Sequence, residues 1–246
     1  MPIDFATEFA AKLKERGCKF DVRGLLTGDD KILTLGNDTK VLSTVFELFS
    51  YPLVKEIAEK HGLRAVTPDA QTVYPDFTLM KEENDKAKVA VDVKTTYRRA
   101  NGTFFYTLGS YTSFLRNDKK NILFPYSTYV QHWMLGFVYS RIPQAEAATH
   151  PLADRAKIPC PYKDVQCFVQ EKYKISGLRP GSGNTTNIGS IQSADIADFE
   201  KGNGPFAAKG EKYFREYWAN YKNGEAFNTL ERFEKWKAEN PHRLKF

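Results

Sequence analysis

The sequence predicts a mixed α/β (α+β) protein with a central mixed β-sheet flanked by helices. Amphipathic helical stretches stand near both ends of the chain, and short β-branched apolar runs stand between them. The 246 residues, 41% hydrophobic and 14% aromatic, are enough to build a sizeable core. These observations indicate a folded α/β protein rather than a disordered chain.

The N-terminal part predicts a short helix and a pair of strands. Residues 4–16 place Phe5, Phe9 and Leu13 on one side of a helix. Residues 19–35 contain two strand-forming runs around a Thr-Gly-Asp-Asp turn, which predicts two strands.

A long helix is predicted next, with Asp38 as its N-cap and Gly62 as its end. Pro52 is expected to kink or divide this helix, because proline cannot donate the backbone hydrogen bond. Three polar residues at helical spacing share another face of the helix: Lys40, Ser43 and Glu47. Spacing alone favours a simple solvated face.

The remaining segments continue the mixture of strands and helices. Strands are predicted over 74–80, 88–97 and 103–110, and a second long helix from Ser127. The apolar residues of that helix are Tyr129, Val130, Trp133, Met134, Phe137 and Val138. A proline- and alanine-rich connector over 142–161, strands near 165–176, a long loop and two C-terminal helices follow.

Composition excludes several classes of protein. No apolar run approaches the roughly 20 residues that span a membrane, and the N-terminus lacks the apolar core of a signal peptide. We therefore expect a cytoplasmic protein with no membrane partner. The cysteines Cys18, Cys160 and Cys167 stand far apart, which disfavours a disulfide framework or a zinc site. The net charge of +6 is compatible with a polyanionic partner but does not establish one.

The stretch VAVDVKTTY, residues 89–97, combines a buried-strand pattern with two opposite charges. Strand side chains alternate between faces, so Asp92 and Lys94 share one face with Ala90. The three valines of the run share the other face. This pattern indicates either a structural compromise or a chemical site.

Asp76 follows Pro75 at the start of the preceding strand-like run. If the two runs pair as a hairpin, Asp76 and Asp92 approach each other from neighbouring strands. Two adjacent carboxylates repel each other unless a cation lies between them, and such hard oxygen ligands suit Mg²⁺. Lys94 could then orient or deprotonate a metal-bound water, or neutralise charge on a phosphorane. The alternative is a surface hairpin with an ordinary salt bridge.

Rival chemistries find less support in the sequence. The four histidines are isolated, which disfavours an HNH-type nuclease or a zinc hydrolase, and each is expected to be structural or solvated. They are His61, His132, His150 and His242. The glycine-rich loop GSGNTTNIGS, residues 181–190, lacks the lysine of a phosphate-binding P-loop, and no G-x-S-x-G motif is present.

The same glycine-rich loop has a second interpretation. Glycines let a backbone approach a surface closely, and asparagine can bond bidentately to adenine in the major groove of DNA. Threonine methyl groups can pack on the methyl group of thymine. Loops of this composition are also common without any function, so the loop alone leaves both interpretations open.

In their order and spacing, these stretches closely resemble the EcoRV family of type II restriction endonucleases. That family belongs to a superfamily of Mg²⁺-dependent nucleases with the signature P-D…(D/E)-x-K. The stretches are LGNDTKVLSTVFELFS, YPDFTL, VAVDVKTTY, TLGSYTSFLRNDKKNI and GSGNTTNIGSI. The resemblance covers most of residues 20–140 and again 161–191, and it is weak over 143–160 and in the C-terminal helices.

The resemblance implies a restriction-endonuclease-like core and a homodimer that grips duplex DNA. Each subunit would cut one strand by in-line attack of water, with Mg²⁺ as cofactor. The whole chain, 1–246, is expected to be one domain, with a catalytic core over 36–140 and a DNA-recognition and C-terminal part over 161–246. Residues 19–35 and 143–160 are expected to be dimerisation elements. A cognate DNA methyltransferase is expected in the same system, with no direct binding implied.

The resemblance also assigns site residues. Asp76 and Asp92 would ligate Mg²⁺, with the carbonyl of Val93 as a further ligand, and Lys94 would be the catalytic lysine. Glu47 matches an acidic position near the family's active site, which adds it to the catalytic and metal-site residues. The major-groove reading residues would be Gly181, Ser182, Gly183, Asn184 and Thr185. Contacts with the DNA backbone or minor groove correspond to Lys40, Ser43, Gln71, Thr72, Thr95, Thr96, Ser113 and Lys120.

One departure from the family concerns the loop over 70–73, Ala-Gln-Thr-Val, where the family has a more amide-rich run. Minor-groove contacts are therefore expected to differ in detail. The intact major-groove loop implies the target GATATC, cut bluntly at its centre.

Two alternatives stay open, an inactive DNA-binding module and a nuclease of the same superfamily with a different DNA substrate. The complete set of Asp76, Asp92 and Lys94 disfavours the first alternative, and the side-chain-rich loop disfavours the second.

Overall fold

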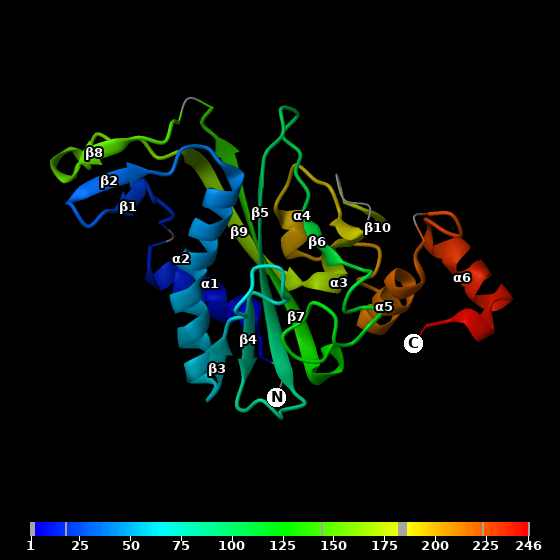
Figure 1. The fold of residues 1–246 in the computed structure, drawn as a ribbon. Helices are drawn as coiled ribbons and strands as arrows, with labels where there is room; N and C mark the ends of the chain where they lie inside the picture. The colour runs from blue at the N-terminus through cyan, green and yellow to red at the C-terminus, as the bar shows by residue number, and fades with distance from the viewer. Residues whose placement is uncertain (1–2, 18, 144, 182–185, 223, 246) are drawn as a thin grey trace.

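The computed structural model describes residues 3–17, 19–143, 145–181, 186–222 and 224–245 (Figure 1). Its centre is a five-stranded sheet in the order β3-β4-β5-β7-β9. These strands are β3 (Arg64–Val66), β4 (Phe77–Met80), β5 (Lys88–Tyr97), β7 (Tyr129–Arg141) and β9 (Tyr162–Glu171). β5 and β7 run parallel and the other neighbours antiparallel, so the predicted central mixed sheet is confirmed.

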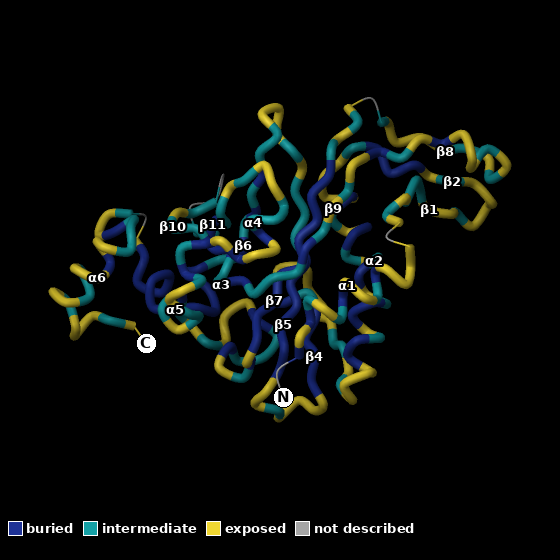
Figure 2. The backbone as a smooth tube through the Cα atoms, turned by 180° about the vertical axis from the view of Figure 1, so that it is seen from behind, coloured by how far each residue is buried: buried dark blue, intermediate teal, exposed yellow. Residues whose placement is uncertain are grey.

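Helices and small sheets cover both faces of the central sheet. The helices α1 (Phe5–Glu15) and α2 (Thr39–Lys60) pack on one face, on the blue side of Figure 1. The other face is covered by α3 (Lys172–Ile175), α4 (Ala197–Glu200) and α5 (Gly210–Asn220), with α6 (Leu230–Glu239) beyond α5. Figure 2 shows the central strands as the buried layer between these two covers.

β5 contributes side chains to both cores. Val89, Val91 and Val93 belong to the cluster under α1 and α2, and Ala90 belongs to the cluster on the other side. This is the alternation predicted from the sequence. A strand buried on both faces is held rigidly, because each side chain has packed neighbours.

The long helix α2 begins and ends close to the predicted positions, Asp38 and Gly62. The side chain of Asp38 accepts hydrogen bonds from the backbone amides of Lys40 (2.8 Å) and Val41 (3.3 Å), which satisfies two of the free amides at the helix start. Pro52 lies inside the helix without dividing it, and the helix continues to Lys60.

Two three-stranded sheets flank the central one. The first, called the arm, joins β1 (Gly24–Leu26), β2 (Lys31–Thr34) and β8 (Thr149–Pro151). Thus the segments 19–35 and 143–160, far apart in the sequence, form one structure that projects from the body (Figure 1). The second sheet joins β10 (Ser176–Pro180), β11 (Asn187–Ser190) and β6 (Thr107–Ser110).

The predicted helix from Ser127 is wrong. After a short 3-10 turn, Tyr126–Thr128, the segment Tyr129–Arg141 is the strand β7. β7 lies between β5 and β9 and is buried almost throughout, so most of its residues are apolar on both faces. A continuous apolar run of this kind lacks the period of two and can imitate the apolar stripe of a helix.

Cys160 and Cys167 form no disulfide within the described part of the chain, and Cys18 lies outside it. In the part of the chain that the structure describes, no helix has the length and apolar character needed to cross a membrane.

Candidate active site

The strand register brings the two aspartates together. β4 and β5 pair as an antiparallel hairpin in which Phe77 lies opposite Val91, so residue 76 comes opposite Asp92. Asp92 and Lys94 lie on β5, and Asp76 immediately precedes β4. The predicted hairpin is thus present, and its geometry joins the Pro-Asp motif to the Asp-x-Lys motif.

The ammonium group of Lys94 lies among three oxygen atoms. Its Nζ is 2.9 Å from Asp92 Oδ1 and 3.7 Å from Asp76 Oδ2, and it donates a 3.0 Å hydrogen bond to the carbonyl of Val93. These are the oxygens of the predicted metal ligands Asp76, Asp92 and Val93. Oxygen donors that converge on a cation are the kind of ligand that Mg²⁺ takes in proteins, so the residues fit this ion.

A second lysine, Lys172, reaches Asp92 from the buried side. Its Nζ lies 3.3 Å from Asp92 Oδ2, and the side chains of both residues are only 3–4% exposed. Lys172 is not among the residues predicted from the sequence, because it follows β9 in a run without a motif. The one sequence signal for Lys172 is its position directly after an apolar strand.

The pKa values of the two aspartates are shifted in opposite directions. Burial raises the pKa of Asp76 to about 6, although the Lys94 ammonium acts in the opposite direction. Burial also opposes the charge of Asp92, but Lys172 and Lys94 outweigh it and lower the pKa of Asp92 below its usual value. Asp92 is therefore the stronger acid of the pair, because it has two close cations and Asp76 has one.

The two lysines are shifted in opposite directions. Burial lowers the pKa of Lys172 to about 8, although Asp92 acts to raise it. Burial also acts against the charge of Lys94, but the carboxylates of Asp92 and Asp76 outweigh it and raise the pKa of Lys94. Lys94 therefore holds its proton firmly in this state of the site.

Glu47 lies near the two aspartates but not in one ligand group with them. It lines a separate cavity of about 350 Å³, together with Tyr51, Thr67 and Phe77. Burial raises the pKa of Glu47, and the Lys94 charge counteracts this. Among the described residues, no group of three or more His, Cys, Asp or Glu side chains is arranged to hold a metal ion. Asp76 and Asp92 therefore form the carboxylate pair of the candidate site, and Glu47 lies at its side.

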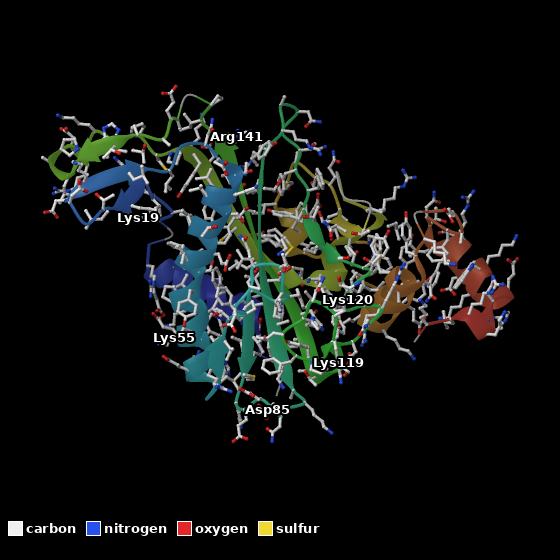
Figure 3. The ribbon with its side chains drawn as sticks, in the orientation of Figure 1. Lys19, Lys55, Asp85, Lys119, Lys120 and Arg141 are labelled. Atoms are coloured by element: carbon white, nitrogen blue, oxygen red, sulfur yellow. The ribbon has the colours of Figure 1, made fainter. Side chains whose placement is uncertain are left out.

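A cleft of about 580 Å³ opens in front of Asp76, Asp92 and Lys94. Four predicted DNA-contact residues line it, Gln71, Thr72, Ser113 and Lys120. Lys120 comes from the loop between β6 and β7 and is exposed (Figure 3). Four others are not among its lining residues: Lys40 and Ser43 on α2, and Thr95 and Thr96 on the last part of β5.

The structure describes the two ends of the predicted base-reading loop. Ser182, Gly183, Asn184 and Thr185 lie outside the described residues. Gly181 lines an adjacent cavity of about 560 Å³, while Thr186 and Asn187 line the cleft of Asp76 and Asp92. The backbone amide of Gly181 donates a 2.9 Å hydrogen bond to the carbonyl of Asn187, which closes the loop at its base. The far end of the loop is therefore part of the wall of the candidate active site.

The arrangement of carboxylates, lysine and cleft suits metal-assisted hydrolysis. Two aspartates and a carbonyl can hold a divalent cation, and a lysine beside them can serve an attacking water or a developing negative charge. Comparison with known proteins agrees with this chemistry. Residues 16–238 match the family model described as "Restriction endonuclease EcoRV".

This chain belongs to the EcoRV family of restriction endonucleases. A curated relative, the type II restriction enzyme EcoRV of Escherichia coli, is 44% identical over 232 residues. That alignment covers 91% of this chain and 94% of the relative. The family membership predicted from the sequence motifs is thereby confirmed, and so are the predicted fold class and enzyme class. Endonucleases of the EcoRV family are generally metal-dependent.

Proposed function

We propose that this chain is a Mg²⁺-dependent type II restriction endonuclease that cuts both strands of duplex DNA at GATATC, bluntly at the centre. The observation that carries the proposal is the convergence of Asp76, Asp92 and the Val93 carbonyl on one cationic centre beside an open cleft. The family and the 44% identical relative support the DNA substrate.

Each residue of the site has a definite task in this proposal. Asp76 and Asp92 hold Mg²⁺, with the Val93 carbonyl, and the ion would supply Lewis-acid activation of water and phosphate. Lys94 stands beside both carboxylates, where it orients the attacking water and offsets charge on the phosphate. Glu47 lies to the side of the pair and acts on it through its charge.

The DNA lies across the cleft in this proposal, with its bases read by the loop over 181–185. Gln71, Thr72, Ser113 and Lys120 line the cleft, which supports contacts with the backbone or minor groove. Lys40, Ser43, Thr95 and Thr96 lie outside it and would contact DNA that extends past the cut. The altered run over 70–73 changes minor-groove contacts and leaves the target sequence unchanged.

We also propose that the enzyme is a homodimer joined through the arm. The arm exposes three leucines in one small sheet, Leu25 (49%), Leu26 (66%) and Leu33 (43%). Leu25 lies opposite Leu33 and shares one face with it, while Leu26 lies on the other face. Exposed leucines on both faces of so small a sheet favour a protein interface. One dimer would carry two active sites, one for each DNA strand. The enzyme would act in the cytoplasm beside a methyltransferase that protects the host's own sites.

The test is digestion of a plasmid that carries one GATATC site. We expect one linear product with Mg²⁺, blunt ends at the centre of the site on end sequencing, and no product with a chelator. A plasmid with one base of the site changed is the matched control. Binding without cleavage would favour a catalytically inactive module, and cleavage independent of the site would favour a different DNA substrate. Either result would overturn the proposal.

A further inference from the structure

Lys172 is a buried lysine held by charge and not by hydrogen bonds. Its side chain is 3% exposed, and its Nζ makes an ion pair of 3.3 Å with Asp92 Oδ2. Within the described part of the chain, neither of these two atoms has a hydrogen-bond partner. The Nζ also lies 3.9 Å from the centre of the Tyr74 ring, which offers its negative face to the cation.

A second buried lysine shows what a purely structural lysine in this fold looks like. Lys88, at the start of β5, is 1% exposed, and its Nζ donates hydrogen bonds to the carbonyls of Glu83 and Asp85. These carbonyls belong to the turn between β4 and β5, whose residue Asp85 is labelled in Figure 3. Lys88 thus fastens a turn, whereas Lys172 faces the carboxylate of a proposed metal ligand.

The charges at the site balance without any added ion. Asp76 and Asp92 carry two carboxylates, and Lys94 and Lys172 place two ammonium groups against them. Asp92 lies between the two lysines, with Lys94 on Oδ1 and Lys172 on Oδ2. A divalent cation that binds Asp92 is therefore repelled by Lys172 at short range in a poorly solvated environment.

We propose that Lys172 is a positioning residue that acts through Asp92 and weakens the binding of divalent cations to this site. It fixes Oδ2 of Asp92, so that Oδ1 is directed to Lys94 and the cleft. Its charge opposes a second cation on the same carboxylate. The negative charge of a DNA phosphate in the cleft offsets this repulsion, so metal binding is favoured when substrate is present. The inference rests on the proposed function, in which Asp76 and Asp92 bind a metal ion.

The test is a titration of the DNA-free protein with Mn²⁺, followed by the electron paramagnetic resonance signal of free Mn²⁺. Three variants accompany the wild type: Lys172→Met, Lys172→Arg and Lys88→Met. Methionine removes the charge and keeps a flexible side chain that can pack on Tyr74. Arginine keeps the charge and changes the packing. Lys88→Met removes an equally buried lysine from the same fold.

We expect Lys172→Met to bind Mn²⁺ at least about tenfold more tightly than the wild type, because a nearby positive charge is gone. Lys172→Arg and Lys88→Met should bind with the wild-type dissociation constant. Structural damage at a binding site weakens metal binding, so tighter binding by Lys172→Met would not result from damage to the fold. Unchanged or weaker binding by Lys172→Met, or equal effects of methionine and arginine, would overturn the inference.

Thermal unfolding provides a second measurement, which can also be made on a variant of low stability. A ligand stabilises the folded state more when it binds that state more tightly. Mn²⁺ should therefore raise the Tm of Lys172→Met more than that of the wild type, and an equal or smaller rise would contradict the inference. Absence of Mn²⁺ binding by the wild type and Lys172→Met alike would overturn the metal site of the proposed function as well. Equal binding by both would overturn only the role of Lys172.

Discussion

Asp76 Oδ2 accepts a 2.6 Å hydrogen bond from the backbone amide of Val93. The amide belongs to β5, which is buried on both faces and paired on both edges. The orientation of the Asp76 carboxylate is therefore set by a buried central strand, although Asp76 itself precedes a short strand. The same residue, Val93, offers its carbonyl to Lys94. The backbone of Val93 thus positions the side chains of both Asp76 and Lys94.

Replacing either aspartate should abolish cleavage, with different effects on stability. We expect Asp76→Ala and Asp92→Ala to lower the cleavage rate more than about a thousandfold, since each loses a metal ligand. Asp92→Ala should also lower the free energy of unfolding by about 3–5 kcal/mol, because Lys172 stays buried without its partner. Asp76→Ala should cost less, because the Asp76 side chain is 21% exposed. Plasmid cleavage and urea unfolding measure both effects.

The double variant Asp92→Ala, Lys172→Met is the control for this contrast. It removes both charges, so it should recover part of the lost stability while remaining inactive. Equal stability of Asp92→Ala and the double variant would show that Lys172 is compensated by other groups.

Loss of the Lys94 charge should slow catalysis and spare DNA binding. Lys94→Met keeps much of the side-chain volume and removes the ammonium group beside both carboxylates. We expect cleavage to fall by about 10²–10⁴-fold, the range that one proton-transfer or charge-stabilising group contributes. Gel-shift titration with an uncleaved GATATC duplex should give nearly the wild-type Kd. Cleavage at the wild-type rate would remove Lys94 from the mechanism.

His132 should make the protein less stable in mild acid. It is buried, and its Nδ1 shares a 2.8 Å hydrogen bond with the Tyr74 hydroxyl. Burial, with the charges of Lys172 and Arg215, lowers the pKa of His132 well below its ordinary 6.5, despite Glu211 Oε1 at 3.5 Å from Nε2. Below pH 6.5 the unfolded chain therefore binds a proton that the folded chain does not bind.

The stabilisation from neutral His132 is complete above pH 6.5 and declines as the pH falls toward the folded-state pKa. The slope is up to about 1.4 kcal/mol per pH unit. Urea unfolding between pH 7.5 and 5.5 should show a steeper loss for the wild type than for His132→Gln, whose amide can still bond to Tyr74. Comparison with this variant removes the contributions of other titrating groups. Parallel pH profiles of the two proteins would contradict the prediction.

Gly136 should tolerate no side chain. It lies on β7 opposite Phe168 of β9, and a Cβ atom there would come within 2.3 Å of the Phe168 ring. Phe168 is itself buried, so the ring cannot move freely. We expect Gly136→Ala to lower the free energy of unfolding by about 1–3 kcal/mol. Gly28→Ala, with no other atom within 4 Å of its Cβ, is the control and should change stability by less than about 0.5 kcal/mol.

A charge on the arm should separate the proposed dimer. Leu26 is 66% exposed on β1, and Leu26→Glu would put a carboxylate into the proposed interface. Sedimentation velocity should show a dimer for the wild type and a monomer for this variant. Leu48→Glu, at a leucine 63% exposed on α2, is the matched control and should remain dimeric. A wild-type monomer at micromolar concentration would refute the proposed assembly.

The sequence predicted the parts of the fold that carry a local signal. The alternation of Val89, Val91 and Val93 identified β5, and Asp38 identified the start of α2, because period and capping are local properties. The local pattern of β7 predicts a helix instead, because the burial of β7 on both faces depends on β5 and β9, which no local pattern contains.

The candidate site shows the same contrast between residues that a local motif predicts and residues that only tertiary packing brings in. Asp76, Asp92 and Lys94 follow a known spacing, and the structure brings them together. Lys172 comes from a segment 78 residues after Lys94 and reaches Asp92 only through the packing of α3 against the central sheet. Glu47, assigned by resemblance, lies in a neighbouring cavity, because spacing along a helix does not determine where the helix face meets the sheet.

The proposed base-reading loop leads into β11, and β11 is hydrogen-bonded to β6, whose last residues enter the wall of the cleft in front of Asp76 and Asp92. In the proposed function, the small sheet that carries the reading loop therefore also forms part of the wall in front of Asp76, Asp92 and Lys94, which belong to the central sheet. Transplanting the loop alone would move the proposed base-reading residues without the strands that hold the loop in place. A change of target sequence in this scaffold should require β6, β10 and β11 to be exchanged as one unit.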